Sequence, residues 1–216
     1  MKLYNAPHSP YAARVRTQIY AKGINDIEIL PPPGFGTPAF KEINTTGKIP
    51  ALEVDDMVIP ESMVIMEYIE QVFPEKALRP SDAKARAVVN LMARFPDVYI
   101  QPALFPLFRE VMQKTGDQEA LKNNIANLKT QLKLLDDLMG QYNWGTQTDV
   151  DFADCALAPT VFWAVLVPGM FGESDILKDT PRVQSWWERC KANPVIGKVI
   201  TEMDEGFKAF MARFQK

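Results

Sequence analysis

The stretch Gly47-Lys48-Ile49-Pro50-Ala51-Leu52, with Glu61-Ser62 eleven residues after its proline, places a proline before a predicted strand and a polar pair before a predicted helix. We expect Ile49-Pro50 to be cis, since X-Pro is the linkage where the cis form costs little. The Ile49 N–H and C=O could then pair with a peptide as an added strand does. Glu61 could meet an ammonium group, while Ser62 and the free N–H groups of the helix meet a carboxylate. The pattern predicts a site for a small, zwitterionic peptide.

Each part of this pattern also has a purely structural interpretation. Pro50 could simply begin a strand, and Ser62 could simply be the N-cap of the helix that follows. The ordered combination of the two favours the binding site.

The N-terminal third of the chain predicts a strand, a helix and a second strand, followed by a loop, two more strands and a helix. The first segments are, in order, a strand Lys2–Asn5, the loop Ala6–Ser9, a helix Pro10–Lys22 closed by Gly23, and a second strand Ile27–Leu30. An irregular loop Pro31–Phe40 follows, with a short helix to Ile43. In the first helix Tyr11, Val15 and Ile19 form one apolar stripe, and Arg14, Arg16, Thr17 and Lys22 supply polar positions around it. This order is typical of a thioredoxin-like α/β domain, one mixed sheet with helices on both faces.

The remainder of the chain predicts helices almost throughout. A long pattern from Asp82 to Lys114 is interrupted by Pro96, Pro102 and Pro106, which should bend or segment it, and an amphipathic helix spans Leu121–Leu138. Asp151 and Asp154 fit a capping box ahead of a helix, Cys155–Val167, that is apolar all round and should be buried. Further helices are expected over Pro181–Lys191 and Val195–Phe214.

Composition excludes several classes of function. The net charge of −3 gives no electrostatic reason to expect a nucleic acid or an anionic membrane as partner. We expect neither a spanning helix nor a signal peptide, and therefore a cytoplasmic protein. Two cysteines, Cys155 and Cys190, are too few for a disulfide framework, and a single histidine, His8, makes a metal site improbable.

Taken together, these motifs resemble the soluble glutathione S-transferase family over nearly the whole chain. The matching residues are Ser9 with Arg14-Val15-Arg16, then Lys48-Ile49-Pro50, Glu61-Ser62, and Asp151-Phe152-Ala153-Asp154. Arg-Val-Arg behind a first-loop serine looks most like the zeta class, as does Ile100-Gln101-Pro102. The zeta pattern, however, carries a serine pair and a cysteine where this chain reads Ser9-Pro10-Tyr11-Ala12-Ala13.

The resemblance implies a glutathione transferase fold of two domains. Residues 1–76 would form a thioredoxin-like glutathione-binding domain and residues 84–216 an all-α C-terminal domain. It also implies a homodimer in which the first domain of one chain packs on the helical domain of the other.

The resemblance implies that glutathione is a co-substrate and that Ser9 activates its thiol. Because the thiolate is the nucleophile, a hydroxyl donor at a helix N-terminus would stabilise it. Ser9 could instead be an ordinary N-cap ahead of a first-turn proline. Tyr11 could line the pocket and donate its phenol, Tyr4 more plausibly packs beneath the sheet, and His8 would line the mouth of the cleft.

Glutathione would contact one set of residues and the second substrate another. The γ-glutamyl end would meet Glu61 and Ser62, the cysteinyl backbone Ile49 beside Pro50, and the glycyl end Lys48. An apolar electrophile would lie between the Ser9 loop and the segmented helix, with the aromatic residues Phe95, Tyr99, Phe105 and Phe210 as candidates. Two alternatives remain: a glutathione-dependent cis-trans isomerase of the maleylacetoacetate or maleylpyruvate type, and a non-catalytic binding protein on the same fold.

Overall fold

The computed structural model describes residues 1–213, which pack as two compact units. The first consists of residues 1–79 and the segment from Pro194 onward, and the second of Pro80–Asn193. The predicted helix 195–214 corresponds to α9 (Pro194–Ala212), while Phe214 lies outside the described residues. The division places α9 with the first unit, whereas the sequence placed it in the helical domain; the boundaries 1–76 and 84–216 stay a prediction.

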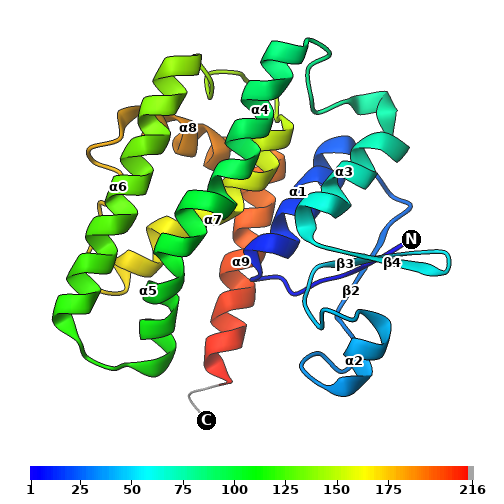
Figure 1. Cartoon of the computed structure of the whole chain (residues 1–216), viewed down its shortest axis with the longest axis horizontal. Helices are drawn as coiled ribbons and strands as arrows, with labels where there is room; N and C mark the ends of the chain where they lie inside the picture. The colour runs from blue at the N-terminus through cyan, green and yellow to red at the C-terminus, as the bar shows by residue number, and fades with distance from the viewer. Residues whose placement is uncertain (214–216) are drawn as a thin grey trace. The chain divides into compact units, whose positions relative to one another are not determined.

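The first unit contains a four-stranded mixed sheet in the order β2-β1-β3-β4. Its strands are β1 (Lys2–Tyr4), β2 (Glu28–Leu30), β3 (Ala51–Val54) and β4 (Met57–Pro60). β1 runs parallel to β2 and antiparallel to β3, and β3 pairs with β4 as a hairpin. Figure 1 shows α1 (Pro10–Lys22) and α3 (Ser62–Val72) on one side of the sheet and α2 (Pro38–Ile43) on the other. The predicted thioredoxin-like α/β arrangement is confirmed.

Two apolar layers hold this sheet. Leu3 and Leu52 are fully buried, as is Ile65 of α3. On α2, Phe40 packs with Tyr4 and Ala51, and the half-buried Ile43, Ile49 and Val58 join that cluster. Tyr4 is therefore a core residue, as the sequence suggested.

The amphipathic interpretation of α1 was wrong in two respects. Val15 and Ile19 are buried as expected, but the first residue of the predicted stripe, Tyr11, is 39% exposed. Arg14, Arg16 and Thr17, which were expected to supply polar positions around the stripe, are buried instead. The reason is that α1 packs against both α3 and α9, so that most of its surface is covered.

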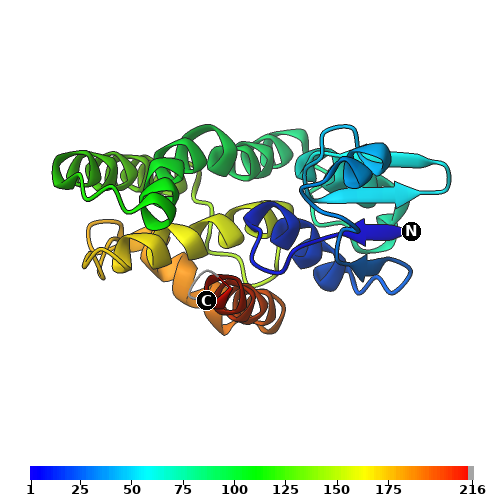
Figure 2. The same ribbon diagram turned by 90° about the horizontal axis from the view of Figure 1, so that it is seen from below.

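The second unit is helical, and its proline-rich stretch is segmented at Pro96 as predicted, whereas Pro102 and Pro106 lie inside one helix and do not divide it. Its elements are α4 (Ala83–Phe95), a π-helical turn η2 (Pro96–Ile100), α5 (Gln101–Gln113), α6 (Gln118–Tyr142), α7 (Phe152–Gly169) and α8 (Pro181–Ala192). A short 3-10 turn, η1 (Pro74–Lys76), follows α3 in the first unit. Figure 2 shows α7 running beside α4 and α5, and both contacts occur in the structure.

Helix α7 is the buried centre of this unit. Its stretch Phe152–Gly169 is long and apolar enough, by length and composition, to cross a membrane, with a mean hydropathy of 1.5. However, 83% of that stretch is buried inside the protein, which is the usual situation of a core helix.

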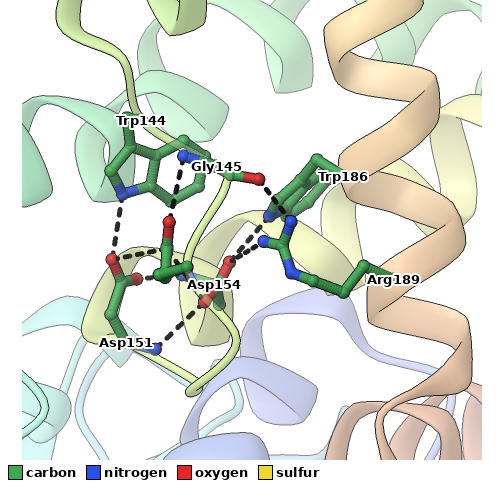
Figure 3. A network of polar contacts seen from close by, with 7 residues as sticks. Trp144, Gly145, Asp151, Asp154, Trp186 and Arg189 are labelled. Atoms are coloured by element: carbon green, nitrogen blue, oxygen red, sulfur yellow. Dashed lines mark hydrogen bonds and ion pairs between the residues drawn. The ribbon is translucent and has the colours of Figure 1, made fainter.

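The start of α7 is a capping box, as the sequence predicted. The Asp151 carboxylate accepts from the Asp154 N–H at 2.8 Å, and the Asp154 carboxylate accepts from the Asp151 N–H at 3.0 Å. Two indoles join the network (Figure 3): Trp144 Nε1 donates to Asp151 at 2.9 Å and Trp186 Nε1 donates to Asp154 at 2.7 Å. Arg189 donates to the Gly145 carbonyl beside them.

Burial of two carboxylates in one network shifts their protonation. Desolvation, together with repulsion from Asp154, raises the pKa of Asp151 to about 7. Desolvation also raises the pKa of Asp154, although the donated hydrogen bonds oppose that shift. The capping box therefore links the stability of the helical unit to pH.

The raised pKa of Asp151 predicts the sign of this dependence. An unfolded aspartate titrates at about 3.9. Asp151 thus contributes stability that is complete below pH 4 and is lost as pH rises through about 7. From pH 5 to pH 7 the wild type should lose unfolding free energy relative to Asp151→Asn. The difference in unfolding free energy between the two proteins should therefore narrow, by at most about 1.4 kcal/mol per pH unit.

Urea unfolding followed by circular dichroism at several pH values measures this difference. Asp149→Asn, at an exposed position two residues earlier, is the matched control for removal of one aspartate charge. A constant or widening difference for Asp151→Asn would contradict the assignment.

Candidate functional site

The strand register brings the predicted site segments to one end of the sheet. Tyr4, the last residue of β1, pairs with Ala51, the first residue of β3, and Ala51 pairs with Pro60, the last residue of β4. The Ser9 loop, the segment before β3 and the start of α3 therefore all leave the sheet at this end. With neighbouring strands about 4.8 Å apart, β1 and β4 lie about 10 Å apart here.

Ser9 is the N-cap of α1, and its Oγ accepts a hydrogen bond from the Ala12 N–H at 3.3 Å. The structural interpretation of this serine is thus confirmed. This N-cap role is compatible with a catalytic role, because a hydroxyl oxygen that accepts a hydrogen bond still has its own proton to donate. The hydroxyl is half-buried and lies at the positive end of the helix dipole.

Hydrogen bonds from the Arg16 side chain hold the loop that carries Ser9. This guanidinium donates to the Pro7 carbonyl at 2.8 Å, to the Ala6 carbonyl at 3.4 Å and to the side chain of Asn5. The Ser9 N–H in turn donates to the same Ala6 carbonyl at 3.0 Å. Sequence reasoning identified Arg16 as part of a motif but missed this role, because nothing local indicates which carbonyls an arginine will reach.

The segment before β3 has the predicted cis bond between Ile49 and Pro50. The Ile49 side chain packs in the apolar cluster beneath the sheet, and within residues 1–213 neither backbone group of Ile49 has a hydrogen-bond partner. Asn44, a buried residue that sequence reasoning missed, donates to the Lys48 carbonyl at 2.7 Å. The available signal was the turn composition of Asn44–Gly47, which suits a tight turn ending in a glycine of positive φ.

Glu61 and Ser62 start α3 as predicted. Glu61 has φ 67°, a left-handed conformation that is costly for a residue with a side chain and is found preferentially at functional sites. Its carbonyl accepts the first helical bond from Ile65 at 2.9 Å, so the N–H groups of Ser62, Met63 and Val64 precede the helical bonding pattern. Ser62 is 5% exposed, and its hydroxyl has no hydrogen-bond partner among the described residues. The pair offers a carboxylate, a hydroxyl and free N–H groups together.

The other candidates occupy different positions. The Tyr4 hydroxyl donates to Glu53, and this hydrogen bond raises the pKa of Tyr4. The ring of Tyr11 lies 5.0 Å from the Arg14 guanidinium. His8 is half-buried against Phe210, with ring centroids 4.7 Å apart, and burial together with Arg16 and Arg213 lowers its pKa.

The aromatic residues proposed for the second substrate divide by exposure. Phe95 is buried and stacks on Tyr99, so it belongs to the core of the helical unit. Tyr99 is exposed, and Phe105 of α5 is 69% exposed. Tyr99 belongs to the π-helical turn η2, a local irregularity that is frequent at functional sites.

A hollow elsewhere contains none of the predicted site residues. It measures about 500 Å³, lies along α6 and is lined by Lys129, Thr130, Lys133, Leu134, Asp137, Ile176, Asp179 and Thr180. Lys129 is paired with Glu173 at 2.6 Å. Among residues 1–213 no cluster of His, Cys, Asp and Glu could hold a metal ion.

The fold places the chain among thioredoxin-like proteins with an added helical unit. Residues 3–77 match the family described as "Glutathione S-transferase, N-terminal domain", and residues 118–189 match "Glutathione S-transferase, C-terminal domain". Glutathione S-transferase 1 of Dianthus caryophyllus is 31% identical over 186 residues, 82% of this chain and 84% of the relative. The chain therefore belongs to the glutathione S-transferase family.

Two further comparisons agree. Maleylacetoacetate isomerase of Mus musculus is 32% identical over 166 residues, 74% of this chain and 76% of the relative. The crystal structure of glutathione transferase F7 from Populus trichocarpa superposes with a TM-score of 0.78 at 27% identity, covering 94% of this chain and 98% of that one. The predicted two-part fold, a mixed-sheet unit with a helical unit, is thereby confirmed.

Proposed function

We propose that this protein is a cytoplasmic glutathione transferase that binds glutathione at the shared end of β1, β3 and β4. The observation that carries the proposal is the register that brings Ser9, Ile49 and Glu61-Ser62 to that one end. A tripeptide extends over roughly 10 Å, at 3.3–3.6 Å per residue. This length equals the span of about 10 Å between β1 and β4, so one glutathione molecule can contact all three segments.

Each end of glutathione meets a complementary group in this arrangement. The α-amino group of the γ-glutamyl residue meets the Glu61 carboxylate, and its carboxylate meets the Ser62 hydroxyl and the first N–H groups of α3. The cysteinyl backbone pairs with the unpartnered backbone groups of Ile49 beside Pro50. The glycyl carboxylate lies near the exposed ammonium of Lys48.

Ser9 supplies the chemistry. A thiol with a pKa of about 8.5 is mostly protonated at neutral pH, and only the thiolate attacks an electrophile. The Ser9 O–H donates to the thiolate, while the N-terminus of α1 adds its positive dipole. Both effects favour the charged form of the thiol and lower its pKa. Tyr11, exposed in the first turn of the same helix, is the second candidate donor.

The second substrate is a small apolar electrophile. In the helical unit, Tyr99 and Phe105 offer exposed aromatic surface of the kind such a molecule requires.

A second candidate reaction is a glutathione-dependent cis-trans isomerisation. The similarity to a maleylacetoacetate isomerase and the Arg14-Val15-Arg16 motif favour it. A panel of apolar electrophiles and a cis-configured dicarboxylic substrate, each assayed with glutathione, separates the two reactions. Binding of glutathione with no turnover of either class would indicate a non-catalytic binding protein.

Ser9→Ala should lower turnover far more than it weakens glutathione binding, because the hydroxyl acts on the thiolate and not on the ends of the peptide. Loss of one such donor costs about 10²–10³-fold in kcat at well-studied oxyanion sites. The pH dependence of conjugation measures it, with Ser81→Ala, in the exposed linker, as control. An unchanged rate and profile would transfer the role to Tyr11, Tyr4 or water.

Ser62→Ala and Glu61→Ala should each weaken glutathione binding, since each removes a partner from a charged terminus. A hydrogen bond to a charged group contributes about 1.5–3 kcal/mol, or roughly 10- to 150-fold in Kd. Isothermal titration calorimetry gives the affinities, with Glu75→Ala as a control in the exposed turn η1. Affinities equal to that of the wild type would mean that Glu61-Ser62 only begins a helix.

We also propose a homodimer. Met66 on α3 and Val89 and Met92 on α4 are buried within the chain, so these apolar residues give no support for an interface. Met57 on β4 and Val64 on α3, however, are 50% and 53% exposed, as an interface in the first unit requires. Sedimentation equilibrium at micromolar concentration should give about twice the chain mass of 24.4 kDa; a mass equal to that of one chain would refute the dimer.

A further inference from the structure

One face of α9 lies along α1 and reaches the loop that carries Ser9. Lys198, Glu202, Gly206 and Phe210 recur every four residues, so they share this face. The Lys198 ammonium lies 3.9 Å from the centroid of the Tyr20 ring, and the Tyr20 hydroxyl donates to Glu202 at 3.2 Å. Towards the N-terminus of α1 the same face contacts Arg16 and then the loop itself.

The first contact with the loop passes through an ion pair. Arg16 is 2% exposed, and its Nε lies 3.1 Å from the Glu202 carboxylate. A buried guanidinium is tolerated only when its charge is paired and its donors are used. Glu202 supplies the charge, and the Ala6 and Pro7 carbonyls accept from the remaining nitrogens. The path from Glu202 to Ser9 therefore consists of one ion pair, the shared Ala6 carbonyl and the Ser9 N–H.

The second contact is direct packing at Gly206. A Cβ added to this glycine would lie 2.7 Å from the Pro7 Cβ, closer than two such atoms approach, and 3.0 Å from the His8 backbone nitrogen. Glycine is unfavourable within a helix, so its presence here has a packing reason. One turn later, Phe210 lies against the His8 ring.

We propose that α9 is a positioning element for the Ser9 hydroxyl. In this element Glu202 holds Arg16 in place, and Gly206, which has no side chain, leaves room for the loop that carries Ser9. The inference rests on the proposed function, since it concerns the serine that would activate glutathione. It adds Glu202 and Gly206 of α9 to the residues that influence ionisation of the thiol. Glu202 lies 182 positions along the chain from its partner Tyr20.

Two variants test it from opposite directions. Glu202→Gln removes the charge that holds Arg16 while keeping the shape of the side chain. Gly206→Ala displaces the loop while raising the helix propensity of α9, so a loss of function would not reflect a weakened helix. Asp204→Asn is the matched control: its ion pair with Lys208, at 2.5 Å, lies within α9 and does not touch the loop.

The readout is the pH midpoint of thiolate formation in bound glutathione, followed by ultraviolet absorbance, together with kcat and the Kd of glutathione. Both variants should raise the midpoint and lower kcat by about tenfold or more, since small displacements of a catalytic group are costly. The Kd should change by less than about twofold, because the peptide ends bind elsewhere, and such a change is small beside a hydrogen bond to a charged group.

Other groups at this contact do not confuse the readout. Burial, Arg16 and Arg213 lower the pKa of His8, and burial together with Glu202 raises the pKa of Tyr20. Both groups are therefore shifted away from the pH range that lies between the ordinary pKa values of histidine and tyrosine.

The outcomes separate this inference from the proposed function. A wild type that forms no thiolate with glutathione would overturn both. An active wild type with unchanged midpoints in the two variants would overturn the positioning role alone. So would a loss of rate and affinity in parallel with loss of folded protein in a thermal unfolding scan, because a merely structural role predicts that pattern. A shifted midpoint in both variants, with Asp204→Asn unchanged, supports the inference.

Discussion

The hydrogen-bond register of β1, β3 and β4 is the constraint on which the site depends. A slip of one residue would turn every side chain of a strand to the opposite face, so Phe40 could no longer pack against Tyr4 and Ala51. The core thus fixes the register, and the register fixes which chain ends meet. The loop after β1, the segment before β3 and the start of α3 thereby become neighbours.

Helix ends supply the chemistry of this meeting point. The first N–H groups of a helix have no partner within the helix, and the aligned peptide dipoles leave positive potential there. Ser9 caps α1 and Ser62 begins α3, so two such ends lie at the same edge of the sheet. The positive φ of Glu61 shows that the chain bears a backbone cost at this place. A molecule with negative groups at fixed spacing is the natural partner of such an edge.

Buried charge is treated in the same way in both units. In the helical unit, Asp151 and Asp154 are surrounded by backbone, indole and amide donors. In the first unit, Arg16 is surrounded by carbonyls and one carboxylate. Such networks are stable only when complete, because an unsatisfied buried charge costs several kcal/mol. They therefore hold the segments that supply their partners in fixed positions.

The sequence by itself determined the features that depend on near neighbours. The cap and end of α1, the β3–β4 hairpin, the segmentation at Pro96 and the capping box at Asp151 all arise from residues within about four positions of one another. Ser9, Ile49 and Ser62 could be singled out for the same reason. Only the tertiary structure decided that Arg16 is buried, that α9 groups with the first unit, and that Asn44 holds the Lys48 carbonyl. The physical reason is that burial and ion pairing depend on which surfaces meet, and for Arg16 the decisive surface is a helix at the other end of the chain.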